Sequence, residues 1–364
     1  MFINILLPYK EKFTKNKASS VSITVKNNLE YSKHKEKVRV FGQYVDEPMF
    51  TKNFIGVKKS LNIFKSKNKM IADEMCKQVK QSNEKNIIEV HNRPYLIQKI
   101  KSQIKPIDKV TLFFHNNPLE MKGSKTISER KKLLLELDKI YCVSEYVKKN
   151  FLKGISNDHN KVKILHNGVI RKINAFPKKE KEIIFVGRIV KDKGVHLFVD
   201  AIRDNYNLFD KWKFKIIGSP KLGVNKYDNF SFEIKNKFEN IGIRANMIGF
   251  INSDDLNIIM QKASIIVIPS IWEEPFGLVA AEAMSNGLAI IASNRGGLPE
   301  IIKKNGILIN DINHEKISRQ LKKLTSNNKL LKQFQKKSWN NFILKSDKIS
   351  KILDKHRDDL FFKN

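Results

Sequence analysis

The stretch that decides the fold reads Pro269-Ser-Ile-Trp-Glu-Glu-Pro-Phe-Gly-Leu-Val-Ala-Ala-Glu-Ala-Met284. It follows an apolar run, 265–268, that has the length and composition of a buried strand. We predict that a loop follows this strand and that a helix begins near Phe276 or Gly277. The small and apolar residues after Gly277 indicate a helix buried on nearly all sides. A strand, a loop and a helix in this order are the repeating unit of a parallel α/β sheet.

The amino end of this helix has the features of an anion-binding site. Its first N–H groups have no partner within the helix, and the helix dipole favours negative charge there. Glu274 precedes the helix, and Glu282 lies about two turns further on and thus on the same face. An ionised carboxylate accepts two hydrogen bonds as a fork, which suits vicinal sugar hydroxyls. The alternative is that both glutamates are surface charges, which the apolar neighbours of Glu282 disfavour.

A second stretch of this type reads Ile183-Ile-Phe-Val-Gly-Arg-Ile-Val-Lys-Asp-Lys-Gly194. A strand ends at Gly187 and Arg188, a short loop carries Lys193, and Gly194 opens a helix. Two cations on such a loop would clamp a diphosphate. Lysine is abundant throughout this chain, so the stretch becomes specific only together with the glutamate stretch.

The same alternation of short apolar strands and longer amphipathic segments covers the whole chain and predicts parallel α/β sheets. The predicted strands are 2–7, 38–41, 87–90, 109–114, 140–143, 163–165, 182–186, 214–218, 245–248, 265–269 and 289–292. The predicted helices include 71–81, 128–137, 195–203, 254–262 (capped by Ser253) and 277–286. We place domains at 1–168 and 182–335, a linker at 169–181, and a C-terminal segment at 336–364. Two α/β domains joined by a hinge would bind ligands in a cleft, at the carboxyl ends of the strands.

Length and composition agree with this organisation. The 364 residues suffice for two domains, and 41% hydrophobic and 29% charged residues are typical of a globular protein. No run approaches the roughly 20 apolar residues that cross a bilayer. The first eight residues lack the features of a signal peptide and are predicted to form a strand instead. Cys76 and Cys142 are too few for a disulfide framework, and we expect a cytoplasmic protein.

The net charge of +32 indicates an anionic surface or acceptor, or simply a solvated lysine-rich face. Only 10 of the 69 basic side chains are arginine, which argues against a protein that reads nucleic acid. Segment 53–69 mixes apolar residues with lysines. It is interpreted as an ordinary loop and helix, with docking on an anionic membrane face, the inner face of the cytoplasmic membrane, as an alternative.

The two site stretches resemble the donor-site signature of retaining glycosyltransferases of family 4. Two further segments match that family in order. His166-Asn-Gly-Val169 is similar to the segment that ends the first domain, and Ala292-Ser-Asn-Arg-Gly-Gly-Leu-Pro-Glu300 is similar to a conserved loop of the second. The segments Glu89-Val-His-Asn-Arg-Pro94 and Phe114-His-Asn-Asn117 resemble bacterial members that build lipopolysaccharide or other surface glycans. The similarity spans about residues 110–310.

The resemblance implies the GT-B fold, in which two Rossmann-like domains face each other across a cleft and a C-terminal helix crosses back to the first domain. Segment 334–352 looks similar to that helix, with Trp339 as a packing residue. Domain 1–168 would bind the acceptor and domain 182–335 the nucleotide sugar. The family implies no metal ion and no cofactor, with a nucleoside diphosphate sugar as co-substrate.

Roles carried over from the family concern four segments of the second domain. Arg188 and Lys193 would neutralise the donor diphosphate, and Gly187, which precedes Arg188, would belong to the same donor-binding loop. Glu282 would hold the ribose hydroxyls and Glu274 those of the transferred sugar. The remaining donor contacts would come from Phe276, Gly277 and Leu278 and from the base-reading segment Ile248, Gly249 and Phe250.

In the first domain the resemblance points to His115 as the histidine that contacts the sugar near the reacting centre. His91 would be a contact on the acceptor side. Many relatives have a glycine-rich loop after the first strand, whereas this chain has Lys17-Ala-Ser-Ser-Val-Ser22. Ser19 and Ser20 could bind through hydroxyl and N–H groups, although serine does not adopt positive φ as freely as glycine.

The predicted function is therefore the transfer of a hexose from a nucleoside diphosphate sugar, UDP being favoured, to a hydroxyl of a surface glycan. A soluble or polyisoprenoid-linked acceptor is one alternative. A sugar-nucleotide binder without catalytic activity is another, and the altered loop at 18–20 is the feature that favours it.

Overall fold

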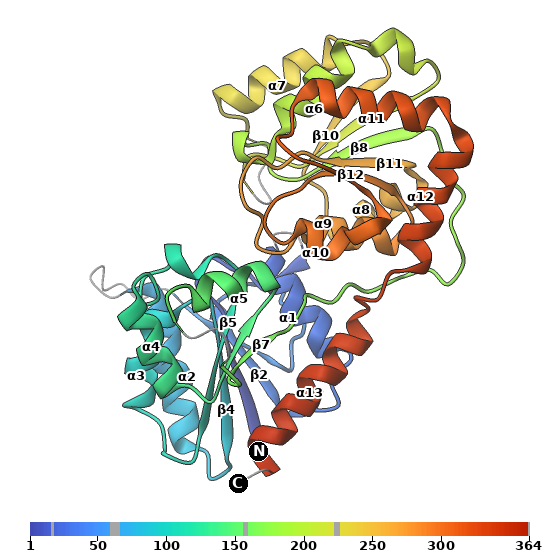
Figure 1. Ribbon diagram of the computed structural model, residues 1–364. Helices are drawn as coiled ribbons and strands as arrows, with labels where there is room; N and C mark the ends of the chain where they lie inside the picture. The colour runs from blue at the N-terminus through green and yellow to red at the C-terminus, as the bar shows by residue number, and fades with distance from the viewer. Residues whose placement is uncertain (16–17, 59–65, 156–158, 222–225, 363–364) are drawn as a thin grey trace. The chain divides into compact units, whose positions relative to one another are not determined.

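The protein is described by a computed structural model that covers residues 1–15, 18–58, 66–155, 159–221 and 226–362. The chain forms two compact units. Unit 1 comprises Met1–Gly168 and Leu344–Asn364, and unit 2 comprises Val169–Ile343. Each unit has one parallel sheet with helices on both faces, which confirms the predicted α/β class (Figure 1).

Unit 1 contains a seven-stranded sheet of order β3-β2-β1-β4-β5-β6-β7. All neighbouring strands are parallel. The strands are β1 (Phe2–Leu6), β2 (Val38–Gln43), β3 (Phe54–Val57), β4 (Asn86–His91), β5 (Lys109–Phe114), β6 (Lys139–Cys142) and β7 (Val162–Ile164). The strand order reverses between β1 and β4, so that the crossovers on either side of this pair lie on opposite faces of the sheet.

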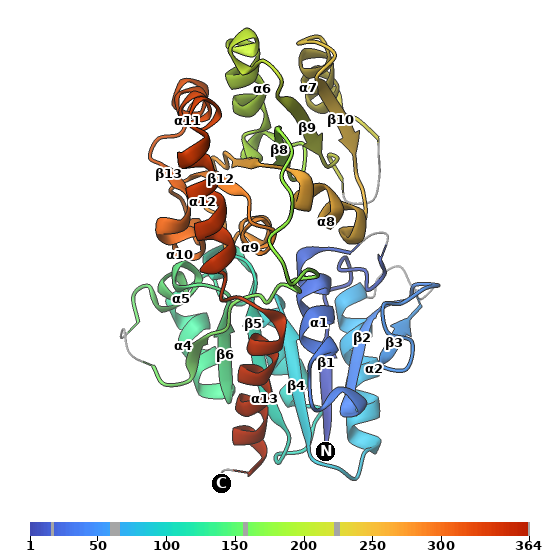
Figure 2. The ribbon, with the colours of Figure 1, turned by 90° about the vertical axis from the view of Figure 1, so that its right-hand side faces the viewer.

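The helices of unit 1 divide between the two faces of its sheet. They are α1 (Ser20–Glu30), α2 (Lys67–Gln81), α3 (Ile97–Lys101), α4 (Ile127–Glu136), α5 (Glu145–Leu152) and α13 (Ser346–Phe362). Figures 1 and 2 show α1 and α13 together on one face, with α2, α3 and α4 on the other. The first and last helices of the chain thus cover the same side of one sheet.

No element was predicted for the segment that forms α1. Ser19 caps this helix, since its hydroxyl accepts a hydrogen bond from the Ser22 N–H. Val21, Val25 and Leu29 recur at intervals of four residues and are buried. The helix therefore forms with one apolar face toward the sheet and α13.

An ion-pair network that is almost completely buried anchors α13. The Arg357 guanidinium donates from Nε and Nη2 to the two Glu89 oxygens, at 2.8 Å each, and from Nη1 to Asp354 at 3.0 Å. Asp354 also accepts from the Ser32 hydroxyl at 2.8 Å, at the end of α1. Strand β4, helix α1 and the C-terminal helix are therefore connected by one set of charges.

The C-terminal helix belongs to unit 1, as the predicted fold requires, but the chain returns later than residue 336. Helix α12 (Asn328–Asn340) remains in unit 2, where Gln335 donates to the Ser264 carbonyl at 3.2 Å and the guanidinium of Arg171 stacks on Trp339 at 3.9 Å. Segment 169–181 also belongs to unit 2. The Lys179 ammonium donates there to the carbonyls of Met260, Gln261 and Asn286, at the ends of two helices.

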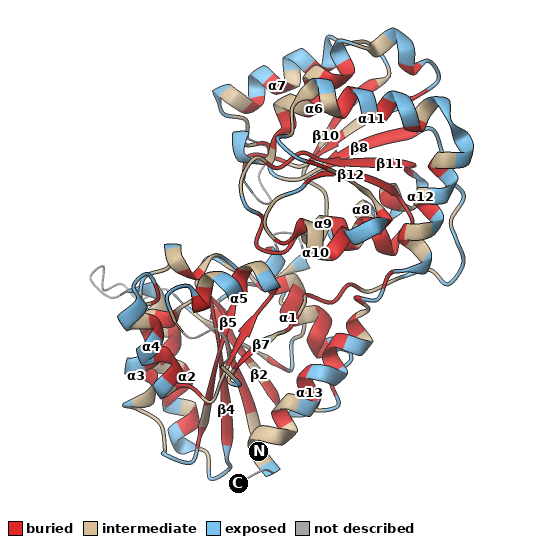
Figure 3. Cartoon of the chain, viewed as in Figure 1, coloured by how far each residue is buried: buried red, intermediate tan, exposed pale blue. Residues whose placement is uncertain are grey.

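Unit 2 contains a six-stranded parallel sheet of order β10-β9-β8-β11-β12-β13. The strands are β8 (Glu182–Val186), β9 (Lys213–Ile217), β10 (Ala245–Gly249), β11 (Ile265–Ile268), β12 (Ala289–Ser293) and β13 (Ile307–Ile309). The strand order reverses between β8 and β11. Figure 3 shows that the strands are buried along most of their length, whereas the outward sides of the helices are exposed.

The helices of unit 2 are α6 (Val195–Arg203), α7 (Asn229–Glu239), α8 (Ser253–Lys262), α9 (Leu278–Ser285), α10 (Leu298–Ile302), α11 (His314–Ser326) and α12. Apolar residues of α6, α7 and α11 form one buried cluster with the sheet. Helices α8 and α9 lie on the opposite face (Figure 1). Ser253 is not the cap of α8 as predicted; the side chain of Asn252 accepts from the N–H groups of Asp254 and Asp255.

The Arg357 network leads to a stability prediction. Replacing Arg357 with Met leaves the Glu89 carboxylate buried without its partner, which typically costs about 3–5 kcal/mol. Hydrogen exchange of the β4 amides, which reports on unit 1 separately, should show this loss. The matched control is Lys33→Met, which removes an exposed ion pair to Asp358 on the same helix and should change little. Equal protection of the β4 amides from exchange in the two variants would contradict the role of Arg357 in anchoring α13.

Candidate active site

The predicted donor residues of unit 2 gather at one edge of its sheet. Because all strands are parallel, their carboxyl ends lie along this edge. Gly187 and Arg188 follow β8, and the stretch from Pro269 to Phe276 follows β11. Strands β8 and β11 are the pair at which the strand order reverses, the usual position of ligand sites in open α/β sheets.

The loops after these two strands are joined by an ion pair between Lys193 and Glu274. The same carboxylate oxygen accepts from the buried hydroxyl of Ser270 at 2.6 Å. The Lys193 ammonium also lies 5.0 Å from the centroid of the Trp272 ring, within range of a cation–π interaction. The structure thus places a cation and a carboxylate from separate motifs in direct contact.

Gly194 makes this close approach of the two loops geometrically feasible. Its φ is +69°, and a Cβ atom built on it would lie 1.9 Å from the carbonyl oxygen of Pro269. The Ile271 N–H donates to the Asp192 carbonyl at 2.9 Å beside it. Any larger residue at 194 would push the Lys193 loop away from the end of β11.

Helix α9 begins at the predicted place. Gly277 precedes it with φ +94°, a conformation that L side chains rarely adopt. Phe276 is buried, and Gly277 and Leu278 are half-buried at the amino end of the helix. Ala280, Ala281, Ala283 and Met284 are buried, which agrees with the predicted apolar helix.

Glu282 projects from α9 among these apolar neighbours. Its side chain is half-buried, and among the described residues no hydrogen bond or ion pair to its carboxylate is present. Desolvation raises the pKa of this carboxyl to about 7. A partly desolvated carboxylate without a protein partner is suited to accept hydrogen bonds from a ligand.

The remaining predicted donor residues lie at the same edge of the sheet. Arg188 is exposed, and the described part of the chain provides it with no ion-pair partner. Ile248 and Gly249 end β10, and the Gly249 carbonyl accepts from the Gly218 N–H at 2.8 Å. Phe250 follows and is half-buried.

Sequence reasoning missed three residues that support the site. Ser270 and Trp272 contact Glu274 and Lys193 as described above. Glu273 accepts from the Gly296 N–H at 2.6 Å and pairs with Arg295 at 3.2 Å, which holds the loop after β12 against the loop after β11. Their position directly after a buried strand was the available signal, but the partners could not be read from it.

Unit 1 places His91 and His115 together. His91 ends β4, His115 follows β5, and their Nδ1 and Nε2 atoms are 2.8 Å apart. Their exposed fractions are 3% and 8%. Both side chains are therefore almost completely buried, and the acceptor contact of His91 stays a prediction. Desolvation lowers the pKa of both imidazoles, that of His115 to about 4.

The acceptor-side serines lie at the start of α1. Ser19 is buried and its hydroxyl caps the helix, whereas Ser20 is exposed in the first turn. Lys17 lies outside the described residues. In the segment considered for membrane docking, Phe54–Val57 form the edge strand β3, while residues 59–65 lie outside the described residues. Both interpretations of that segment missed this strand.

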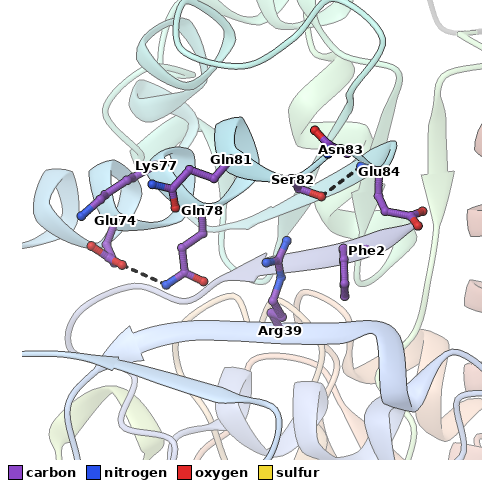
Figure 4. A pocket seen from close by; sticks show the side chains of 9 residues that line it. All are labelled: Phe2, Arg39, Glu74, Lys77, Gln78, Gln81, Ser82, Asn83 and Glu84. Carbon is purple, nitrogen blue, oxygen red and sulfur yellow. Dashed lines mark hydrogen bonds between the residues drawn. The ribbon is translucent and has the colours of Figure 1, made fainter.

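A surface hollow of about 580 Å³ lies in unit 1 at the edge of the sheet where strands β1 and β2 begin, opposite to the edge that carries His91 and His115 (Figure 4). Its lining is polar apart from Phe2, over which the Arg39 guanidinium stacks at 4.3 Å. The other lining residues are Glu74, Lys77, Gln78, Gln81, Ser82, Asn83 and Glu84. None of the predicted site residues contributes to this hollow.

The described residues contain no group of three or more His, Cys, Asp and Glu side chains that could hold a metal ion. None of their helices is both long and apolar enough to cross a membrane.

Comparison with known proteins follows the same division of the chain. Residues 167–340 match the family model of glycosyl transferases group 1. An uncharacterized glycosyltransferase of Methanocaldococcus jannaschii is 33% identical over 218 residues, a match that covers 57% of this chain and 57% of that protein. The lipopolysaccharide 1,2-N-acetylglucosaminetransferase of Salmonella typhimurium is 27% identical over 172 residues, which covers 44% of this chain and 45% of that protein.

The crystal structure of Alr3699/HepE from Anabaena, in complex with UDP, matches over 99% of this chain and 100% of its own, with a TM-score of 0.75 and 13% identity. The fold is GT-B. This confirms the predicted fold class. The matches cover 57%, 66% and 60% of the lengths of the first three curated relatives, so the sequence similarity is partial.

The raised pKa of Glu282 leads to a pH prediction for the unliganded protein. Folding raises this pKa from 4.5 to about 7, so the protonated carboxyl is favoured in the folded state. That stabilisation is complete below pH 4.5 and is lost as the pH rises through 7. Glu282→Gln should match the wild type near pH 4 and exceed its free energy of unfolding by up to about 3 kcal/mol at pH 8.

Urea unfolding across this pH range measures the effect. The matched control is Glu239→Gln, which makes the same substitution at an exposed position of unit 2. A constant difference between Glu282→Gln and the wild type would mean that Glu282 ionises normally.

Proposed function

We propose that this protein is a retaining glycosyltransferase that needs no metal ion and transfers a hexose from a nucleoside diphosphate sugar, with UDP as the favoured nucleotide. The observation that carries the proposal is the contact of Lys193 with Glu274 at the reversal point of the unit 2 sheet. A cation for a diphosphate and a carboxylate for sugar hydroxyls meet there. The family match over 167–340 and the GT-B fold support it.

In this proposal the chain's own cations stabilise the departing nucleoside diphosphate. Arg188 and Lys193 face the negative charge that develops as the glycosidic bond to the phosphate breaks. The N–H groups at the start of α9 would add donors, and the helix dipole would favour the same charge. Glu274 would exchange Lys193 for hydroxyls of the transferred sugar, and Glu282 would hold the ribose.

For the acceptor we propose a hydroxyl of lipopolysaccharide or another surface glycan. The activity for which the Salmonella relative is named and the basic composition of this chain support this class. A net charge of +32 would attract an anionic glycolipid and the membrane surface that carries it. We also propose that the protein works in the cytoplasm, in peripheral contact with the membrane.

Substitution of Glu282 and of Glu274 should affect different quantities, the affinity for UDP and the turnover number respectively. Glu282→Gln should weaken UDP binding, because ribose hydroxyls would lose an ionised acceptor; hydrogen bonds to charged groups are worth about 1.5–3 kcal/mol, or roughly 10- to 150-fold in Kd. Glu274→Gln should mainly lower kcat. Calorimetric titration of UDP and steady-state transfer assays measure the two effects. Equal losses of UDP affinity in both variants would contradict these roles.

The first test of the proposal is a thermal-shift panel of UDP, GDP, ADP and their common hexose conjugates, with and without EDTA. A ligand that binds only the folded state raises its melting temperature by mass action. We expect a selective shift with a uridine nucleotide that EDTA does not change. A shift that EDTA abolishes would overturn the proposal that no metal ion is needed. The absence of a shift with every nucleotide would overturn the transferase assignment.

A further inference from the structure

The alternation of side chains along two neighbouring strands places a polar group beneath α1 and α13. Glu89 and His91 are two residues apart on β4, and Phe113 and His115 are two apart on and after β5. His91 and Phe113 are register partners, so these side chains share one face of the sheet. Figure 2 shows α1 and α13 in front of strands β1, β4 and β5 on that face.

His91 and His115 meet edge to edge. His91 Nδ1 and His115 Nε2 are at hydrogen-bond distance, 2.8 Å, and the two ring planes are only 14° apart with centroids at 5.0 Å, as an in-plane hydrogen bond between the rings requires. Phe113 stacks on His91 at 4.5 Å. Since burial disfavours the charged form of each ring, one proton is shared between these two atoms. The His91 side chain therefore determines which nitrogen of His115 carries a proton.

Asn92 fixes the backbone of His115. Its Oδ1 accepts from the His115 N–H at 2.8 Å, and its own N–H donates to the Phe113 carbonyl at 2.9 Å. Asn92 adopts a φ of +51°, an uncommon conformation that asparagine tolerates better than most residues. Two consecutive residues at the end of β4 thus hold both the side chain and the backbone of His115.

The surroundings of His91 decide the direction of the shared hydrogen bond. His91 Nε2 is buried without a protein partner, and a cavity of about 10 Å³ beside His91 has room for one water molecule. The same cavity is lined by Asn28, whose buried Oδ1 also lacks a partner, and by the Glu89 carboxylate. Arg357 also lines this cavity, but its guanidinium donates to Glu89, Asp354 and Ser32, so the acceptor left without a partner is Asn28 Oδ1. This acceptor favours a proton on His91 Nε2, which leaves its Nδ1 as an acceptor.

We propose that His91 is a positioning residue that accepts a hydrogen bond from His115 Nε2–H, so that His115 Nδ1 is the nitrogen left to accept a hydrogen bond from a substrate hydroxyl. His115 Nδ1 is buried and has no protein partner. The role in transfer rests on the proposed glycosyltransferase function, whereas the tautomer does not. The recognised group is a sugar hydroxyl, which donates, rather than a carbonyl or phosphate oxygen, which only accepts.

The tautomer can be tested without any substrate. Long-range ¹H–¹⁵N correlation spectra of histidine-labelled protein distinguish rings protonated at Nε2 from those protonated at Nδ1, and the His115→Gln spectrum assigns the signal. We expect His115 to be protonated at Nε2 in the wild type and to become a mixture in His91→Phe, which keeps a stacking ring. His91→Asn, which retains an acceptor near the position of Nδ1, should restore the Nε2 form. A wild-type His115 protonated at Nδ1 would overturn the inference.

Measurements of sugar transfer test whether the positioning of His115 by His91 matters for turnover. His91→Phe should lower kcat on the order of 10²-fold, as expected for a displaced contact group, and leave the Kd for UDP unchanged. His91→Asn should recover part of the loss. The matched control is His356→Phe on α13, where His356 stacks on Tyr141 and does not contact His115. A normal kcat in His91→Phe with an altered His115 signal would overturn the positioning role.

These outcomes are distinguishable from a failure of the proposed function. If the wild type neither binds UDP nor transfers a sugar, the transferase assignment fails, and the spectra still decide the His91–His115 arrangement. If His91→Phe does not fold, its melting curve will show this, and His91→Asn then carries the comparison.

Discussion

In a sheet whose strands all run parallel, every strand ends at the same edge, and the chain must cross one face to begin the next strand. Both units of this protein follow that constraint, and both reverse their strand order once, between β1 and β4 and between β8 and β11. At a reversal the crossovers diverge to opposite faces, and the loops after the two strands are left to line a crevice. The loops carrying Lys193 and Glu274 are those loops in unit 2. Their position is a consequence of the strand order.

The contact of Lys193 with Glu274 serves stability before it serves any ligand. Both side chains are mostly shielded from water, so each would be costly to leave alone, and the Ser270 hydroxyl adds a further donor to the carboxylate. A diphosphate offers Lys193 a greater negative charge than one carboxylate does. Sugar hydroxyls offer Glu274 replacement donors at the same time. Under the proposed function, one ligand therefore satisfies both charges, and neither remains buried without a partner.

The sequence predicted β5 and β8 to the residue, because each is an apolar run bounded by polar or glycine residues. The donor motifs were also recognisable, because each is contiguous in the chain. Helix α1 was missed, since Val21, Ile23 and Val25 alternate like a strand and the helix depends on burial beneath a segment more than 300 residues away. The roles of Glu273 and His91 were out of reach for the same reason. Their partners are set by which strands are neighbours and in which register, and no local pattern encodes this.

Some of the unfavourable groups in the two units lie near the places where the strand order reverses. Asn92 has a positive φ, the His91–His115 pair has buried nitrogens without partners, and Glu282 is desolvated without a partner among the described residues. Such groups persist only where the surrounding structure holds them, as Arg357 and Glu89 do beneath His91. Asn92 and His91 adjoin the carboxyl end of β4, at the reversal in unit 1, and Glu282 lies in the helix that follows β11, at the reversal in unit 2. These groups thus lie at strand ends that topology selects, whereas the positive-φ residues Lys211, Lys303 and Asp311 lie elsewhere in unit 2.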